Sequence, residues 1–321
     1  MHNFTYQQPS SVDAAVSASG RFIAGGTTLV DLMKLGVELP PALVDITALP
    51  LDQVEVLPNG GLKIGAMVRN SDLANHPEVL KSYAVLSQAL LSGASPQLRN
   101  MATTGGNLLQ RTRCPYFRDP SSGACNKRNP GSGCAAMEGH HRMMAILGTS
   151  DHCIATHPSD MCVAMTALEA TIHVQGAKGT REIAIGEFYK LPGNTPEVEN
   201  VLEPGELITH VTLPPATDTK QVYLKLRDRA SYEFALASAA VVAHVEGGRI
   251  RSVRVAMGGV GTRPWRSHEA EAALTGKAAN AASFHAAAEA ALKGAKTHPE
   301  NAFKVELAKR CVVRALKMAT A

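Results

Sequence analysis

The sequence predicts an α+β fold with more than one domain. Short strand-like segments occur at 43–47, 62–67 and 207–213, and the segments 170–174 and 181–185 form a predicted hairpin. The end of the chain is instead a series of alanine-rich helical segments. Strands and helices that are segregated along the chain in this way are typical of the α+β class. A length of 321 residues indicates two or three domains.

Composition excludes several classes of protein. Hydrophobic residues make up 45% of the chain and charged residues 19%, as in ordinary soluble globular proteins. A net charge of +4 is small for this length and does not favour nucleic-acid binding. No apolar run approaches the roughly 20 residues that a membrane span needs. The opening residues MHNFTYQQPSSVDAAV lack the basic and apolar regions of an export signal.

The first candidate site is a strand, a glycine turn and a helix near the N-terminus. After a short helix at 13–20, Phe22 to Ala24 form a predicted buried strand, and Leu29 to Leu35 form a helix with apolar positions on one face. The turn GGTT between them places unpaired backbone N–H groups at a helix start, where a phosphate can bind. An ordinary tight turn is the alternative interpretation.

A second glycine–threonine turn follows a helical region. Residues 70–91 form a predicted helix that is capped near Ser71 and interrupted at Pro77. The turn SPQLRN then leads into TTGGN at 103–107. Two such turns favour a dinucleotide pyrophosphate site more than either does alone. Neither turn matches the G-x-G-x-x-G or P-loop spacing, so a Rossmann or ATPase site is not expected.

The most unusual stretch is a long loop between Thr103 and Asp160. It contains Cys114, Cys125, Cys134 and Cys153, with gaps of 10, 8 and 18 residues. A long loop without secondary structure is usually functional or disordered. Disulfides, zinc and an iron–sulfur cluster could each tie it down, but zinc sites usually show close C-x2-4-C pairs. The spacing alone leaves these three alternatives open.

The remaining elements follow in order. Ser159 is a predicted N-cap, and Asp160 lies in the first helical turn, where a carboxylate is stabilised by the helix dipole. The segment 214–220 is rich in proline and polar residues, which indicates a domain boundary. Strand-like segments follow it, and the last helix is expected at 300–318. Cys162 and Cys311 are predicted to be core residues.

Three motifs together resemble one family. FIAGGTTLVDLMK, ATTGGNL and HPSDM resemble the FAD-binding subunits of the xanthine dehydrogenase, or molybdenum hydroxylase, family, and RDRASYEFALASAA to VAMGGVGTRPW is similar to their C-terminal domain. The resemblance implies a two-part PCMH-type FAD-binding domain at 1–213 and a smaller α+β domain of the CO dehydrogenase flavoprotein type at 217–321. The inserted loop at about 111–156 is similar to that of periplasmic aldehyde oxidoreductase subunits, where it holds a [4Fe–4S] cluster.

The resemblance implies a role for individual residues. The first turn would wrap the FAD pyrophosphate, the second would add a phosphate and ribityl contact, and Asp160 would hydrogen-bond the ribityl or ribose region. Ile208, or its neighbour Leu207, would contact the adenine end, and Lys225 would lie near the isoalloxazine edge, where a cation stabilises reduced flavin. The implied FAD-binding residues are Arg21, Phe22, Ile23, Ala24, Gly25, Gly26, Thr27, Thr28, Leu29, Thr103, Gly105, Gly106, Asn107, Asp160, Ile208 and Lys225.

The four loop cysteines, Cys114, Cys125, Cys134 and Cys153, would be the [4Fe–4S] ligands. The loop region also contains six cations: Arg111, Arg113, Arg118, Lys127, Arg128 and Arg142. Positive charge near a cluster raises its reduction potential. We therefore expect these cations to tune the cluster or to face an acidic partner, with a solvated basic loop as the alternative.

The function implied by the resemblance is electron transfer within a complex. A molybdenum cofactor-binding large subunit would oxidise an aldehyde to a carboxylic acid, and a small [2Fe–2S] subunit would pass the electrons to FAD on this chain and on to an external acceptor. This chain alone would not oxidise aldehydes. The alternatives are a free-standing flavin oxidase or dehydrogenase and a non-enzymatic, zinc-stapled interaction module. The periplasm, reached by co-export with a signal-bearing partner, is the expected compartment, and the cytoplasm is the alternative.

Overall fold

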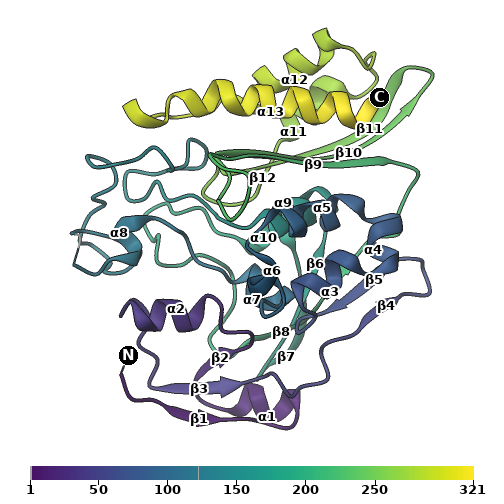
Figure 1. Cartoon of the computed structure of the whole chain (residues 1–321). Helices are drawn as coiled ribbons and strands as arrows, with labels where there is room; N and C mark the ends of the chain where they lie inside the picture. Colours follow the sequence, from purple (N-terminus) through teal and green to yellow (C-terminus); the bar gives the residue numbers. More distant parts are fainter. Residues whose placement is uncertain (1, 122) are drawn as a thin grey trace.

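A computed structural model describes residues 2–121 and 123–321. It contains three sheets, with strand orders β1-β3-β2, β4-β5-β8-β6-β7 and β12-β11-β10-β9 (Figure 1). The chain is a mixture of helices and sheets, as the α+β prediction requires. No helix within the described residues is both long enough and apolar enough to cross a bilayer.

The first sheet is small and parallel. It joins β1 (Thr5–Gln7), β3 (Ala42–Asp45) and β2 (Arg21–Ile23). Ser11 caps α1 (Val12–Ser17), because its side chain accepts a hydrogen bond from the amide of Ala14 at 3.1 Å. The predicted helix after the glycine turn is confirmed as α2 (Leu29–Lys34).

The five-stranded sheet is the larger sheet of the N-terminal part of the chain, before residue 214. Its strands are β4 (Val54–Val56), β5 (Leu62–Gly65), β8 (Leu207–Leu213), β6 (Thr171–Gly176) and β7 (Gly179–Ala184), paired antiparallel throughout. The predicted hairpin is therefore confirmed as β6–β7. The remaining helices of this part are α3 (Asn70–Asn75), α4 (Pro77–Ser82), α5 (Ala84–Ser92), α6 (Pro96–Arg99), α7 (Thr104–Leu108), α8 (Pro115–Arg118), α9 (Asp160–Ala167) and α10 (Ile185–Phe188).

Two details differ from the sequence predictions. The helix at 70–91 is interrupted at Pro77 as expected, but its cap is Arg69 rather than Ser71. Arg69 has extended backbone and forms an isolated bridge with Thr103, so the chain turns helical immediately after it. The segment expected as a TTGGN turn is the helical turn α7, and Thr103 is its cap.

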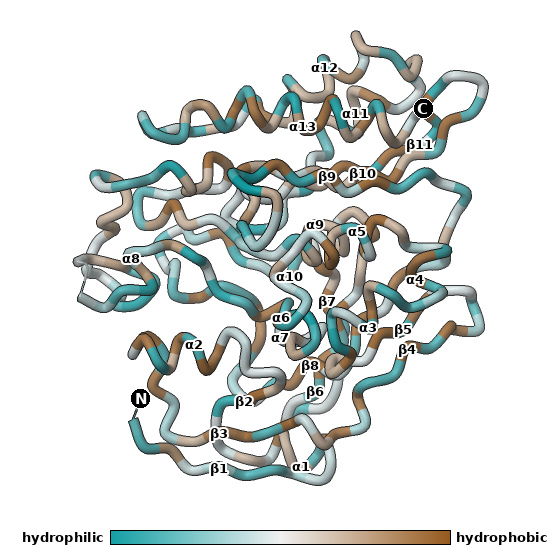
Figure 2. The backbone as a smooth tube through the Cα atoms, in the orientation of Figure 1, coloured by the Kyte–Doolittle hydropathy of each residue, from teal (hydrophilic) through white to brown (hydrophobic). Residues whose placement is uncertain are grey.

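The C-terminal sheet lies between two helical layers (Figure 1). It contains β9 (Lys220–Leu226), β10 (Ala237–Glu246), β11 (Arg249–Gly258) and β12 (Trp265–Arg266). The helices α11 (His268–Leu274), α12 (Ala281–Leu292) and α13 (Phe303–Thr320) cover one face, while α5 and α9 pack on the other. Because both faces are covered, β10 is buried continuously from Ala237 to Ala243, and apolar residues follow its length (Figure 2).

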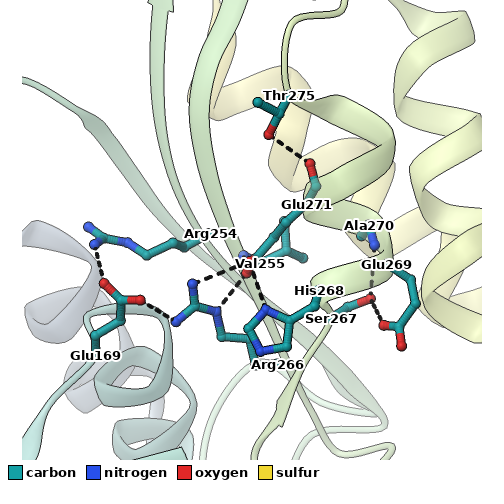
Figure 3. Close-up of polar contacts among 10 residues, drawn as sticks. All are labelled: Glu169, Arg254, Val255, Arg266, Ser267, His268, Glu269, Ala270, Glu271 and Thr275. Atoms are coloured by element: carbon teal, nitrogen blue, oxygen red, sulfur yellow. Dashed lines mark hydrogen bonds and ion pairs between the residues drawn. The ribbon is translucent and has the colours of Figure 1, made fainter.

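Ion pairs link this sheet to the end of α9 (Figure 3). The carboxylate of Glu169 accepts from Arg254 at 2.8 Å and from Arg266 at 2.7 Å. Arg266 also pairs with Glu271 of α11 at 2.7 Å. Glu169 therefore connects the FAD-binding part of the chain to β11, β12 and α11.

The cysteine loop leaves this framework at one side and has a small core of its own. Leu32 of α2 packs there against Phe117, Met144 and Ile154, with three of the four cysteines buried among them. The loop is also attached to the C-terminal part, because the amides of Ile146 and Leu147 donate to the carbonyl of Val260 at 2.8 and 3.0 Å. The described part of the long loop is thus packed into the fold.

Candidate functional site

The first glycine turn packs closely against the segment that leads into the second turn. A Cβ on Gly25 would lie 1.8 Å from the carbonyl oxygen of Met101, so no other residue fits without moving the backbone. Gly26 has a φ of +70°, a conformation that glycine adopts without strain. These two glycines hold the segment after β2 directly beside the chain that leads into α7.

The second turn is stabilised by its cap residue, Thr103. The side chain of Thr103 accepts from the amide of Gly106 at 3.3 Å, and the hydroxyl of Thr104 donates to the carbonyl of Val68 at 3.1 Å. A Cβ on Gly105 would lie 3.1 Å from the Cβ of Ala66, so α7 packs closely on the segment after β5. Gly-Gly-Asn thus faces the first turn from a fixed position.

Two adjoining cavities lie beside these turns, and the larger one extends to the C-terminal sheet. The smaller, about 110 Å³, is lined by the segment from Arg21 to Leu29, by Thr103, Gly105 and Gly106, and by both Leu207 and Ile208. The larger, about 300 Å³, is lined by Asn107, Asp160 and Lys225. Thr27, Thr28 and Gly106 line both. Every residue that the sequence analysis assigned to FAD therefore lies along one elongated cleft.

A buried ion pair lies in the larger cavity. Lys225 Nζ of β9 donates to Asp160 Oδ2 at 2.8 Å, and the two side chains are 3% and 8% exposed. Tyr223 of the same strand donates its hydroxyl proton to the other carboxylate oxygen, Asp160 Oδ1, at 2.5 Å. Burial and the neighbouring carboxylate raise the pKa of Tyr223 well above its usual value, so the phenol stays a donor. Asp160 has structural partners in addition to its expected FAD contact.

The cleft also contains polar groups without partners, which fits a bound ligand. Asn70 lines the larger cavity, and its Oδ1 is buried without a hydrogen-bond donor among the described residues. Arg113 lines the same cavity, and its Nε is similarly buried without an acceptor there. Buried polar groups in folded proteins are nearly always hydrogen-bonded. A bound group with both donors and acceptors, as FAD has, would satisfy such atoms.

The four loop cysteines line a third, smaller cavity. Cys114, Cys125, Cys134 and Cys153 all line it, together with Phe117 and Lys127. None of them is in a disulfide. Within residues 2–121 and 123–321, however, no three His, Cys, Asp or Glu side chains are placed to hold a single metal ion. The structure thus brings the four thiols together around one small space.

The surroundings of these thiols favour their neutral form. Burial raises the pKa of Cys114 to about 12, and burial also raises the pKa of Cys153, although the nearby ammonium of Lys127 opposes that rise. Buried thiols become metal ligands only as thiolates, and a bound metal centre supplies the positive charge that ionises them. Cys162 and Cys311 are buried elsewhere, as predicted.

The loop cations are mostly engaged within the chain. Arg111 pairs with Glu38 and Glu199, both at 2.6 Å, and Lys127 pairs with Glu199 at 2.9 Å. The remaining cations pair with Asp31, with Asp228 or with backbone carbonyls; they are Arg113, Arg118, Arg142 and Arg128. Among the described residues, Lys127 is the one cation of these six that lines the cysteine cavity. The expectation that these cations partly tune a cluster or face an acidic partner stays a prediction.

The sequence analysis did not indicate Asn70, which lines the larger cavity, or Tyr223, which hydrogen-bonds to Asp160 at that cavity. Tyr223 precedes Lys225 by two positions on β9, so the two side chains share one face of the strand. That signal was present in the sequence. The cavity position of Asn70 depends on the bridge between Arg69 and Thr103, which joins segments far apart in the chain, and no local pattern indicates it.

Comparison with known proteins defines the class. Residues 2–216 match the model of the FAD binding domain in molybdopterin dehydrogenase, and residues 222–319 match that of the CO dehydrogenase flavoprotein C-terminal domain. The chain belongs to the family of FAD-binding subunits of molybdenum hydroxylases, and it is an oxidoreductase subunit.

Individual relatives are similar over nearly the whole length. The aldehyde oxidoreductase FAD-binding subunit PaoB of Escherichia coli K12 is 52% identical over 100% of this chain and 99% of the relative. The glyceraldehyde dehydrogenase medium chain of Sulfolobus acidocaldarius is 29% identical over 86% of this chain and 83% of its own length. Among solved structures, a carbon monoxide dehydrogenase from Hydrogenophaga pseudoflava matches with a TM-score of 0.77 and 27% identity, covering 99% of this chain and 97% of that chain.

Proposed function

We propose that this chain is the FAD- and [4Fe–4S]-binding electron-transfer subunit of a molybdenum-containing aldehyde oxidoreductase complex. The observation that carries the FAD assignment is the single cleft lined by both glycine turns, Asp160 and Lys225. The similarity to the aldehyde oxidoreductase subunit of E. coli supports the aldehyde assignment. The cavity shared by four free cysteines supports the cluster.

The residues would divide the work along the cleft. Backbone amides of the first glycine turn would hold the pyrophosphate, because unpaired N–H groups at a helix start attract anions. The amides of Gly105 and Gly106 in the second turn already donate within the chain, so that turn would contribute its close backbone approach. Lys225 would place a positive charge in the larger cavity, which would hold the isoalloxazine ring. Bound FAD supplies one- and two-electron chemistry, which suits a carrier between one-electron centres and an external acceptor.

The cysteine loop would be a second redox site. Four thiolates can hold a cubane cluster when they converge in space, even with irregular sequence spacing. Lys127 is the cation that lines their cavity, and its ammonium is fixed by Glu199 and by the carbonyl of Pro196 at 2.7 Å. Its charge would favour the reduced cluster.

The chain would act only with partners. A large subunit with the molybdenum cofactor would oxidise the aldehyde, and a small subunit with [2Fe–2S] centres would deliver electrons to the flavin of this chain in a heterotrimer. The complex would reach the periplasm folded, carried by a partner with a signal. Fractionation of cells that express all subunits tests this last point, since complex confined to the cytoplasm contradicts it.

The decisive experiment is purification of the co-expressed complex under anaerobic conditions, with FAD and iron analysis. We expect bound FAD and more iron than the [2Fe–2S] centres alone require. Cys125→Ser should lower the iron content and leave FAD in place, whereas Cys162→Ser should leave both unchanged. Full iron in the Cys125 variant would rule out the cluster, and a wild-type complex without FAD would rule out the flavin assignment.

A further inference from the structure

Tyr223 and Lys225 both hold the same carboxylate, although they come from a different part of the chain. Asp160 begins α9, and the two other residues alternate along β9 of the C-terminal sheet. Tyr223 donates to Oδ1 at 2.5 Å and Lys225 to Oδ2 at 2.8 Å. Both oxygens of Asp160 therefore accept a hydrogen bond from β9, at the wall of the larger cavity.

Counting the donors of Lys225 leaves one for a ligand. An ammonium has three N–H groups. One donates to Asp160, and a second donates to the carbonyl of Ser92 at 3.1 Å. The third has no acceptor among the residues that the structure describes, although Lys225 is only 3% exposed and lines the cavity.

The phenol of Tyr223 fixes the orientation of the carboxylate that holds Lys225. Asp160 is 8% exposed and accepts from Tyr223 at one oxygen and from Lys225 at the other, so the two bonds together set how the carboxylate lies. Without the phenol, Oδ1 loses its donor and the carboxylate is free to turn. The third N–H of Lys225 is then no longer held in one direction.

We propose that Tyr223 is a positioning residue that acts through Asp160 to hold Lys225 with its one remaining N–H directed at the bound flavin. This inference rests on the proposed function, because FAD is the ligand of the cavity. Reduction adds negative charge to the flavin, so a nearby cation favours the reduced form. Tyr223 therefore raises the flavin midpoint potential without touching the flavin.

The test is a double-mutant cycle in the complete purified complex, with the flavin midpoint potential as the readout. Tyr223→Phe should shift that potential to a more negative value, by up to about tenfold in the ratio of reduced to oxidised flavin, or ~30 mV for a two-electron couple. Lys225→Gln should shift it further. In the Lys225→Gln background, Tyr223→Phe should add no shift, because its effect passes through the lysine.

Tyr83→Phe is the matched control. Tyr83 is equally buried, at 2% exposed, and its hydroxyl donates to the carbonyl of Pro214 at 2.8 Å, away from the cleft. It should leave the potential unchanged. An unchanged potential in Tyr223→Phe, or equal shifts with and without Lys225, overturns the proposal while bound FAD still supports the proposed function. A wild-type complex that lacks FAD overturns both.

Discussion

The Nζ of Lys304 lies 2.6 Å from the carbonyl oxygen of Gly259 and 2.9 Å from that of Met144. A third carbonyl, that of Met143, accepts at 3.2 Å. Lys304 is fully buried at the start of α13. One ammonium thus ties the end of the cysteine loop to the glycine turn after β11.

Replacing this lysine should loosen the loop. Lys304→Met keeps the volume but removes the donor of two buried carbonyls, while that of Met143 still accepts from Thr156 at 2.7 Å. We expect a loss of about 1 to 3 kcal/mol in the free energy of unfolding at neutral pH. Urea unfolding measures it. Lys309→Met is the control, because Lys309 pairs with Glu289, which is 68% exposed, and should cost much less. Equal losses in the two variants would contradict the assigned role.

The same lysine should make stability depend on pH. Burial lowers the pKa of Lys304 from 10.5 to about 7 in the folded state. Between these two values the unfolded chain binds more protons than the folded one, so this group makes stability rise with pH. We expect the stability of the wild type, relative to Lys304→Met, to increase by about 1 to 2 kcal/mol from pH 7 to pH 9. A constant difference over that range would mean that the pKa of Lys304 is not lowered in the folded state.

The sequence predicted the parts of the fold whose signals are local. Three such parts were predicted: the hairpin β6–β7, the strand β8 and the helix cap at Ser159. Each depends on residues that are close together in the chain. The position of Lys304 was not predicted, because a lysine in an amphipathic helix is normally solvated. Its burial depends on carbonyls from two distant segments.

The candidate site was predicted mainly through the resemblance to a family. Periodicity and spacing alone left the glycine turns and the cysteine loop with several interpretations. The contacts that distinguish them are long-range: Tyr223 with Asp160, and Gly25 with Met101. Such contacts depend on how β9 and α9 pack, which no local pattern specifies.

Glu199 should matter for stability more than most acidic residues. It forms ion pairs with Arg111 and Lys127, whose side chains are 17% and 10% exposed. Glu199→Gln leaves Lys127 without its counter-ion and Arg111 with Glu38 alone, and we expect a loss of about 2 kcal/mol in the free energy of unfolding. Glu55→Gln, at an exposed pair with Lys63, should lose under about 1 kcal/mol.

The pH dependence of this pair has a defined sign. The two cations lower the pKa of Glu199 from 4.5, despite its burial. Its contribution to stability is therefore present above the unfolded pKa and is lost as pH falls through the lower folded value. Acid unfolding of the wild type and of Glu199→Gln should converge below pH 4.5. Curves that stay parallel into that range would refute the ion-pair explanation.

The last prediction concerns the turn on which the FAD assignment depends. Gly25→Ala would place a Cβ 1.8 Å from the backbone oxygen of Met101, so the two segments that border the cleft must separate. We expect the purified complex to lose most of its FAD, measured by flavin absorbance after denaturation. Gly186→Ala is the control, because nothing lies within 4 Å of its Cβ position and it lies outside the cleft. If Gly25→Ala retains full FAD and unfolds like the wild type, the close approach of Gly25 to Met101 is not what shapes the binding cleft.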